Sequence, residues 1–424
     1  MKKIYVYILL LSVSLMGTRL TDFVLGIWLL DLDDQGVILY SLTWFFSLAP
    51  SILLGPLISS IVDRWDKNKI IFFGQLIAGI GSLILMILYY FNALLPWYIF
   101  IITMISSICF SFVFKSFNRC IPEIVPQEKL IKTNGLISSV YEVIEIGVPI
   151  AAPIFYKIIS LGNFFLIDFL TFIIPVTFFL IIKLPSTTRS GQALNLLTDF
   201  KIFRGFINRN KELKVLILYS MFTAFIIGML NILFTPLILD YSNEYALSVI
   251  FIFLSLGGLS AGLVSIGQNR LSKTLNPIRL NIRMGLMISI ILIISSIYFS
   301  IYTIALGGMC VLFLFNFSSI IKKSFFQTVI PPKIQGRVLG YISIFIGISE
   351  SFAYLISGFI IDSLREFLKN QKLRFIPNYT DTYISAAIIL LILLMGIFHF
   401  IISALINKKK KIFVLDNLYK QHTV

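Results

Sequence analysis

The sequence is poor in charge, in cysteine and in histidine. Of its 424 residues only 13% are charged, three are cysteines and two are histidines. Cys109, Cys120 and Cys310 fall in or beside apolar runs, which predicts packing roles and excludes a disulfide framework. His399 stands alone in another such run, so we expect a core residue there and no metal site.

Sequence motifs for ATP hydrolysis and for catalysis are also missing. No G-x-x-x-x-G-K-[S/T] sequence occurs, so we expect no ATP hydrolysis by this chain. No nucleophile, base and orienting group converge in the sequence, so we expect neither an enzyme nor a cofactor.

Apolar residues are what the sequence has in abundance. They make up 58% of it, with a mean hydropathy of +0.94, against about 45–50% in soluble domains. Runs of about 18 or more apolar residues can cross the hydrocarbon core as helices. The fold class expected is an all-α membrane protein with twelve transmembrane helices, in two pseudo-symmetric six-helix bundles. The expected spans are 4–30, 37–62, 70–92, 96–114, 134–157, 164–182, 215–239, 245–266, 284–302, 303–321, 338–361 and 382–406, with a tight turn near Tyr302. The first run continues for more than 20 residues without a cleavage pattern, so we interpret it as a retained helix and not a signal peptide.

Lysine and arginine positions predict the orientation. Positive loops stay in the cytoplasm, and a cytoplasmic N-terminus puts most basic residues inside. Only five then fall outside, namely Lys157, Arg365, Lys369, Lys372 and Arg374. The net charge of +15 is spread over seven loops, which indicates topology and not nucleic-acid binding. Both termini are expected in the cytoplasm.

A long hydrophilic interruption divides the spans into six and six. Its 195–213 portion mixes apolar and charged residues as an amphipathic helix on the inner face of the membrane would. The expected domains are an N-terminal bundle, a linker, a C-terminal bundle and a basic tail, at residues 1–183, 184–213, 214–406 and 407–424.

The two halves resemble each other at a shift of 205 residues. Val125-Pro126 aligns with Ile330-Pro331, and Glu145 aligns with Glu350. Parallel repeats of this kind are typical of two-bundle transporters, whose substrate site lies between the bundles.

At this point the chain resembles the major facilitator superfamily. The segment Asp63-Arg64-Trp65-Asp66-Lys67-Asn68-Lys69 is similar to the signature loop between helices 2 and 3, in the form of the macrolide-efflux-like branch of drug:proton antiporters. Further likenesses are Ser14-Leu15-Met16-Gly17, Ile124-Val125-Pro126 and Ile167-Asp168-Phe169. The chain departs from the family at Ser59, where the family has glycine, and at Gly147-Val148-Pro149, a reduced form of the antiporter signature.

The resemblance implies a gating role for this loop. A carboxylate such as Asp63 can favour the positive end of a helix dipole, and in the family the neighbour is helix 11, so the contact would close the inner gate. Arg64, Asp66 and Lys67 belong to the same candidate gating loop. The alternative is that its charges only maintain topology.

Charges inside the spans are the candidates for coupling, because an ionisable group at membrane depth is costly. Glu142 and Glu145 lie three apart on one face of the fifth helix, and two close carboxylates in low dielectric cannot both ionise cheaply. We therefore expect at least one to hold a proton near neutral pH. Glu350 is expected to face the same cavity from the other half. The alternative for each glutamate is a structural partner such as a hydroxyl or a cation.

Three further charges lie in spans. Arg19 and Asp22 share a face of the first helix and are candidates for the cavity, or they neutralise each other. Asp168, near the outer end of the sixth helix, is expected to serve helix packing.

The function that these features favour is a proton-coupled exporter of amphipathic small molecules, such as a macrolide or a self-made natural product. It would act as a monomer in a bacterial cell membrane, with protons, the lipid bilayer and the small-molecule substrate as its partners. Two alternatives stay open: a siderophore or lysophospholipid carrier on the same scaffold, and a receptor or assembly factor that transports nothing. Buried carboxylates argue against the last, since a scaffold does not need them.

Overall fold

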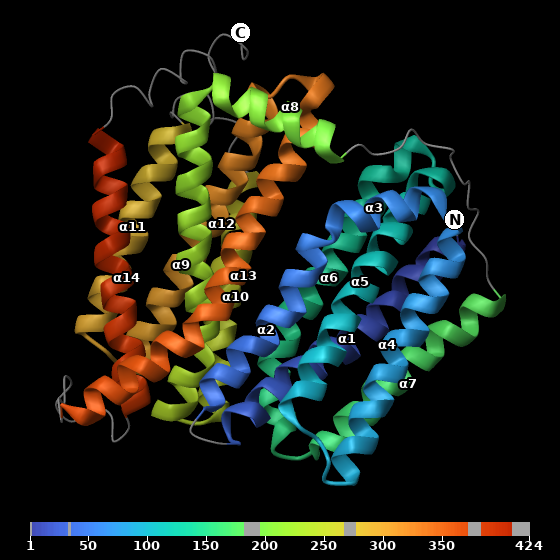
Figure 1. Cartoon of the computed structure of the whole chain (residues 1–424), viewed down its shortest axis with the longest axis horizontal. Coiled ribbons are helices and arrows are strands. Elements are labelled where there is room, and N and C mark those ends of the chain that lie inside the picture. The colour runs from blue at the N-terminus through green and yellow to red at the C-terminus, as the bar shows by residue number, and fades with distance from the viewer. Residues whose placement is uncertain (1, 33–34, 182–195, 267–276, 372–382, 409–424) are drawn as a thin grey trace. The chain divides into compact units, whose positions relative to one another are not determined.

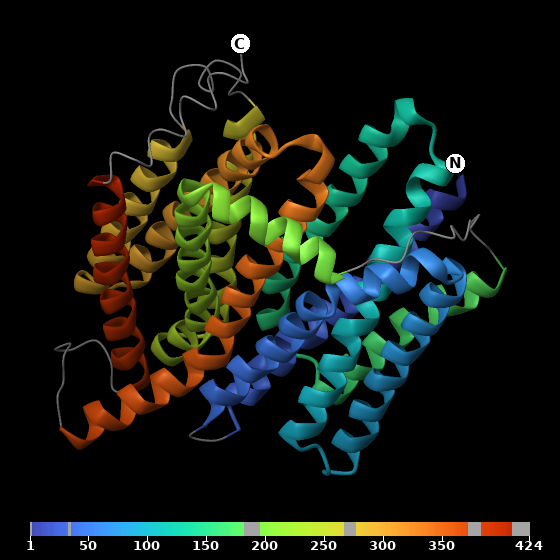
Figure 2. The ribbon, with the colours of Figure 1, turned by 45° about the horizontal axis from the view of Figure 1, so that its top comes forward.

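The structure, a computed structural model, describes residues 2–32, 35–181, 196–266, 277–371 and 383–408. These residues form fourteen helices and no strand (Figures 1 and 2). Twelve of the helices are long and apolar enough to cross a membrane, which confirms the expected fold class and number of spans. The spanning helices are α1 (Lys2–Leu30), α2 (Gly36–Leu53), α4 (Lys67–Tyr90), α5 (Pro96–Ile124), α6 (Gln127–Tyr156), α7 (Leu161–Ile181), α9 (Lys211–Tyr241), α10 (Glu244–Ile266), α11 (Pro277–Ile297), α12 (Ile301–Val329), α13 (Pro332–Asn370) and α14 (Tyr383–Lys408). Lys372, Arg374, the first part of the expected linker and the tail after Lys408 lie outside the described residues.

The second expected span, 37–62, is not one helix. It breaks at Leu54 into α2 and α3 (Gly55–Arg64). Pro56 stands in the first turn of α3, and because proline has no N–H it cannot continue the hydrogen-bond ladder of α2. The Lys115 ammonium of α5 donates to the carbonyl of Gly55 at 2.5 Å, and Ser59 donates to the same oxygen at 3.0 Å. Two side chains therefore satisfy the Gly55 carbonyl at the break between α2 and α3.

Several helices extend past their expected ends. The span expected at 96–114 continues to Ile124, and the one expected at 338–361 reaches from Pro332 to Asn370. The apolar run that predicts a span ends at the first charged residues, whereas the helix itself continues as long as its backbone hydrogen bonds can form. The turn expected near Tyr302 comes earlier, at 298–300, because Ser300 caps α12 by exchanging hydrogen bonds with Thr303 at 3.1 and 2.8 Å.

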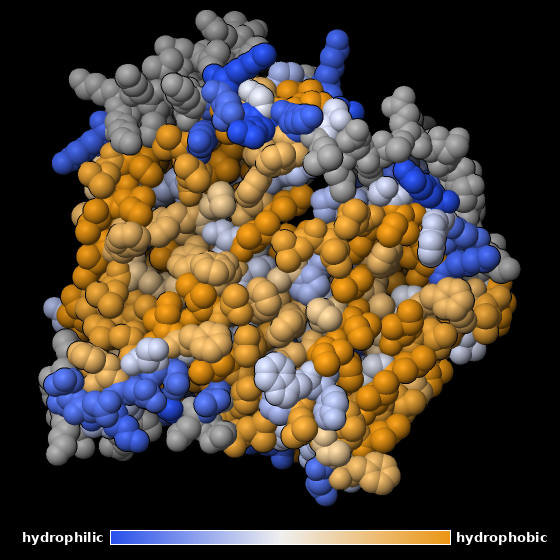
Figure 3. Space-filling view, viewed as in Figure 1, coloured by the Kyte–Doolittle hydropathy of each residue, from blue (hydrophilic) through white to orange (hydrophobic). Residues whose placement is uncertain are grey.

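The chain divides into two units, Met1–Leu194 and Asn195–Val424. In the N-terminal unit, aromatic side chains of α1, α5 and α7 form a core, with the Tyr7 and Phe179 rings stacked at 4.5 Å. In the C-terminal unit, residues of α8, α9, α11, α12 and α13 form the corresponding core, which includes Phe203, Phe325 and Ile342. Figure 3 shows apolar residues over the sides of the helices and hydrophilic residues at the helix ends, as a bilayer-embedded surface requires.

The amphipathic helix expected at 195–213 forms as α8 (Leu196–Arg209). It packs on α9 and α13 of the C-terminal unit. Phe203 is buried there and stacks on Tyr341, while Asp199 pairs with Arg337 at 3.2 Å. These contacts attach α8 to the C-terminal unit.

Candidate functional site

The embedded charges of the N-terminal unit meet on α1 and α6. The Arg19 guanidinium donates to the Glu145 carboxylate at 2.8 Å, and it also lies 5.9 Å from the centre of the Phe110 ring. The pair is not enclosed, since 27% of the Arg19 side chain and 51% of the Glu145 side chain are exposed. A charged, hydrogen-bonded pair therefore lies open on the helix surface within two spans.

Arg19 also interacts through charge with Asp22 on its own helix, so the mutual neutralisation of these two side chains stays a prediction beside this contact. The hydrogen-bonding partner of Arg19 comes from α6, 126 residues away. Asp22 is half-buried and interacts with Arg19 and Glu145 through charge, and among the residues that the structure describes it makes no hydrogen bond or ion pair.

Glu142 lies one turn from Glu145 on α6, as the spacing predicts, and it is exposed. In the part of the chain that the structure describes, it makes no hydrogen bond or ion pair. The face of α6 thus carries one paired and one unpaired carboxylate.

Glu350 lies on α13 of the C-terminal unit and is half-buried. Its carboxylate accepts a hydrogen bond from the Tyr354 hydroxyl at 3.0 Å. Its stem packs on Gly228 of α9, where a Cβ would come within 3.1 Å of the Glu350 Cγ. Its partner is a hydroxyl, whereas the partner of Glu145 is a cation.

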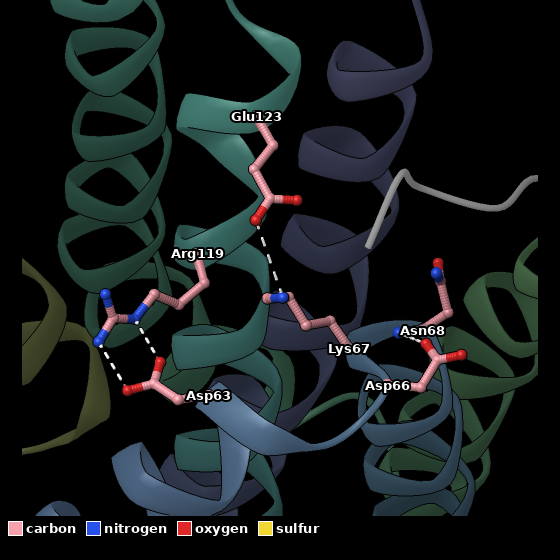
Figure 4. Close-up of polar contacts among 6 residues, drawn as sticks. All are labelled: Asp63, Asp66, Lys67, Asn68, Arg119 and Glu123. Carbon is pink, nitrogen blue, oxygen red and sulfur yellow. Dashed lines mark hydrogen bonds and ion pairs between the residues drawn. The ribbon is translucent and has the colours of Figure 1, made fainter. Parts of the chain in front are cut away.

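The candidate gating loop is held by charges from α5 (Figure 4). Asp63 receives two bonds from Arg119, at 3.0 and 3.1 Å. Lys67 is buried and lies 3.8 Å from Glu123. Sequence reasoning did not single out Arg119 and Glu123; their spacing of four residues at the end of an apolar run is the signal that could have found them.

The other two members of the loop differ in role. Asp66 is the N-cap of α4 and accepts from the Asn68 backbone at 2.8 Å, a local structural contact. Arg64 is exposed. In this structure the Asp63 carboxylate is bonded by Arg119 of its own unit, and its contact with the eleventh span, α13, stays a prediction.

Each unit also has a buried ionisable side chain that is hydrogen-bonded to hydroxyl groups, Asp168 in the N-terminal unit and His399 in the C-terminal unit. Asp168 on α7 is only 3% exposed and accepts from Ser82 at 2.5 Å and Thr18 at 3.2 Å, so it joins α7 to α4 and α1. This geometry agrees with the packing role expected for Asp168. Gly17 of α1 allows the close approach of α7, because a Cβ there would overlap the Thr171 hydroxyl and lie 3.0 Å from the Asp168 carboxylate.

His399 on α14 is fully buried and has a partner at each ring nitrogen. Nδ1 lies 2.8 Å from the Ser289 hydroxyl, and Nε2 lies 3.3 Å from the Thr223 hydroxyl. The Tyr219 and Phe222 rings stack on it. The imidazole is a satisfied core residue, as expected.

Comparisons with known proteins agree with this architecture. The family model of the Major Facilitator Superfamily matches residues 7–353. The chain is 25% identical over 361 residues to Macrolide efflux protein A of Streptococcus pyogenes, covering 83% of this chain and 88% of the relative. It is 28% identical over 299 residues to the protein of that name in Enterococcus faecalis, covering 68% and 90%.

Solved structures share the fold. A bacterial homologue of the human lysosomal transporter Spinster matches with a TM-score of 0.69 at 13% identity, over 98% of this chain and 99% of the other. A bacterial homologue of the iron transporter ferroportin matches with a TM-score of 0.67 at 15% identity, over 95% and 98%. The resemblance drawn from the signature loop is confirmed, with relatives in the macrolide-efflux branch. The chain is a multi-pass membrane transporter and belongs to the Major Facilitator Superfamily.

Proposed function

We propose that this transporter is a proton-coupled exporter of amphipathic small molecules such as macrolides. The observation that carries the proposal is the open ion pair between Arg19 and Glu145, with the unpaired Glu142 one turn away. The names of the relatives supply the substrate class.

Charged side chains near the middle of a spanning helix are energetically unfavourable in contact with lipid. A charged side chain at the centre of a spanning helix costs roughly 2.5–3.5 kcal/mol on insertion scales, yet both glutamates of α6 are exposed. A water-filled cavity against this face removes that cost. The same face then offers carboxylates to a substrate that carries a basic amine.

Coupling follows from competition for Glu145. Protonation of the carboxylate removes the charge-assisted bond to Arg19, which is about twice as strong as a neutral hydrogen bond. A cationic substrate competes with the proton for the same carboxylates, so that substrate and proton bind in turn. Glu350, half-buried beside Tyr354, is the second coupling candidate, at the matching repeat position.

The physiological setting completes the proposal. The transporter works in the bacterial cell membrane as a monomer, with both termini in the cytoplasm. Protons bind from the acidic outside and are released inward as the substrate leaves the cell.

The test is efflux of a panel of fluorescent amphipathic compounds, macrolide derivatives included, from energised cells with and without a protonophore. Wild type is compared with Glu145→Gln and Glu350→Gln. Glu366→Gln is the matched control, because Glu366 is an exposed glutamate near the end of α13.

We expect the protonophore to stop efflux by wild type and Glu366→Gln. Glu145→Gln, which keeps the volume but not the charge, should lose gradient-driven efflux. Efflux that continues unchanged with the protonophore would exclude proton coupling. If no compound of the panel is exported by the wild type, the drug-like substrate class is wrong.

A further inference from the structure

The buried carboxyl of α7 and the buried imidazole of α14 occupy matching places in the two units. Each is bonded to a threonine of the first helix of its half and to a serine of the third. Thr18 and Thr223 lie 205 residues apart, the shift of the repeat, and Ser82 and Ser289 lie 207 apart. The repeat has therefore kept the hydroxyl partners while the central ionisable group differs.

Each hydroxyl around Asp168 has one proton and two acceptors in reach. Thr18 can donate to the Ser14 carbonyl at 3.1 Å or to Asp168 at 3.2 Å. Ser82 can donate to the Ala78 carbonyl at 3.4 Å or to Asp168 at 2.5 Å.

This choice of acceptors satisfies both protonation states of the carboxyl. When Asp168 is ionised, both hydroxyls donate to it. When it is protonated, it donates to one of the two hydroxyls, and that hydroxyl then donates to its backbone acceptor, the carbonyl of Ser14 or Ala78. The other hydroxyl still donates to the unprotonated oxygen of the carboxyl. Only hydroxyl hydrogens move, so neither state leaves a buried polar group unpaired, which would be costly.

The same arrangement surrounds His399. Thr223 also reaches the Tyr219 carbonyl at 2.9 Å, and Ser289 also reaches the Gly285 carbonyl at 2.7 Å. Burial makes the charged form of either group costly. The neutral form of a carboxyl holds an exchangeable proton, whereas the neutral form of an imidazole has yet to take one up. Of the two buried groups, Asp168 is therefore the one whose favoured form carries a proton to release.

The groups that face Asp168 come from α1 and α4, the two helices packed against α7. From α1 the facing charge is Asp22, which interacts with Asp168 through charge and which in turn interacts with Arg19. From α4 the facing group is Ser82, with Tyr90 at the helix end bonded to Asn163 of α7. In the described residues no cation makes an ion pair with Asp168. Asp22 is half-buried and interacts through charge with both Asp168 and Glu145.

We propose that Asp168 is a proton-binding site of the N-terminal unit, switched by the Thr18 and Ser82 hydroxyls and linked through Asp22 to the pair of Arg19 and Glu145. Its part in transport rests on the proton coupling proposed above. Proton binding itself can be tested without a substrate, so the two proposals can fail separately.

The experiment is infrared difference spectroscopy of the full-length protein in lipid, titrated between about pH 5 and pH 8, the range in which a pH switch operates. Wild type is compared with Asp168→Asn and with the control Glu366→Gln. Asparagine can bond both hydroxyls as the protonated acid does, so we expect Asp168→Asn to fold.

We expect the carbonyl absorption of protonated carboxylic acids to include a component that disappears as the pH rises in wild type and control and is missing from Asp168→Asn, while any component from Glu145 or Glu350 remains. In Ser82→Ala, which keeps the carboxyl but removes a donor to its ionised form, the band should persist to higher pH. Identical titrations of wild type and Asp168→Asn would overturn the proposal, as would a band unmoved in Ser82→Ala if Asp168→Asn does not fold. If the spectra behave as expected and efflux by wild type proves independent of protons, the site stands and the coupling fails.

Discussion

At the scale of the residue, the charged side chains of this transporter differ in how far solvent reaches them. The pair of Asp63 and Arg119 is open, with 32% and 58% of the side chains exposed. Asp168 is enclosed by hydroxyls. An exposed pair contributes little to folding because water and salt screen it. A large functional effect of changing an open pair therefore indicates a role other than stability.

The candidate gating loop offers such a test. We expect Asp63→Asn and Arg119→Gln each to lower the free energy of unfolding by less than about 1 kcal/mol, with a coupling energy of about 0.2–1 kcal/mol in the double mutant. We also expect Asp63→Asn to lose most of its efflux, since the family resemblance assigns gating to this carboxylate. Unfolding of purified variants and efflux from cells measure the two effects. Loss of stability in proportion to loss of efflux would show that Asp63 is structural.

Sequence patterns predicted which residues are chemically unusual here but not which of them meet. Glu142, Glu145 and Glu350 stand out because a carboxylate in an apolar run is rare. The partner of Arg19 is 126 residues away on α6, and helix rotation and packing decide that contact. The hydroxyls around Asp168 carry no sequence signal of their own, since serine and threonine are common in spanning helices.

At the scale of the element, glycine positions decide how closely helices pack in each unit. Without a hydrophobic driving force between helices in lipid, close packing at small residues supplies the attraction. In α10, a Cβ on Gly257 would overlap the backbone carbonyl of Met309 on α12, whereas Gly262 has open space where its Cβ would be. The two positions belong to one helix and differ only in what faces them.

This contrast predicts opposite effects of the same substitution. Gly257→Ala should destabilise the protein by roughly 1–3 kcal/mol, because a backbone atom cannot move aside as a side chain can. Gly262→Ala should be neutral or stabilise by up to about 1 kcal/mol, because alanine favours a helix over glycine. Denaturant titration of the two purified variants measures the difference. Equal stability of the two would mean that α10 and α12 are not packed through Gly257.

Helix ends were the least predictable part of the elements. The apolar runs predicted the existence of all twelve spans, since hydropathy and length decide whether a segment can cross the membrane. They could not predict the break at Leu54 or the turn at Ser300, because a proline and a capping serine act on the backbone inside segments that remain apolar.

At the scale of the whole molecule, the distribution of charge predicts how the chain crosses the membrane. An even number of spans puts both termini on the same side, and the positive-inside rule assigns that side to the cytoplasm. The turn between α4 and α5 then lies outside, and the turn between α3 and α4, which belongs to the candidate gating loop, lies inside. Gating from the cytoplasmic side requires this orientation.

Thiol accessibility tests the orientation directly. Cysteine is placed at Ala93, exposed in the turn between α4 and α5, or at Trp65, 64% exposed between α3 and α4. Cys310, the exposed native cysteine among the three, is replaced by alanine, while Cys109 and Cys120 are buried. We expect a membrane-impermeant maleimide to label Ala93→Cys in intact cells, and Trp65→Cys only after the membrane is permeabilised. Labelling in the reverse order would invert the topology, place Asp63 on the outer surface and exclude a cytoplasmic gate at this loop.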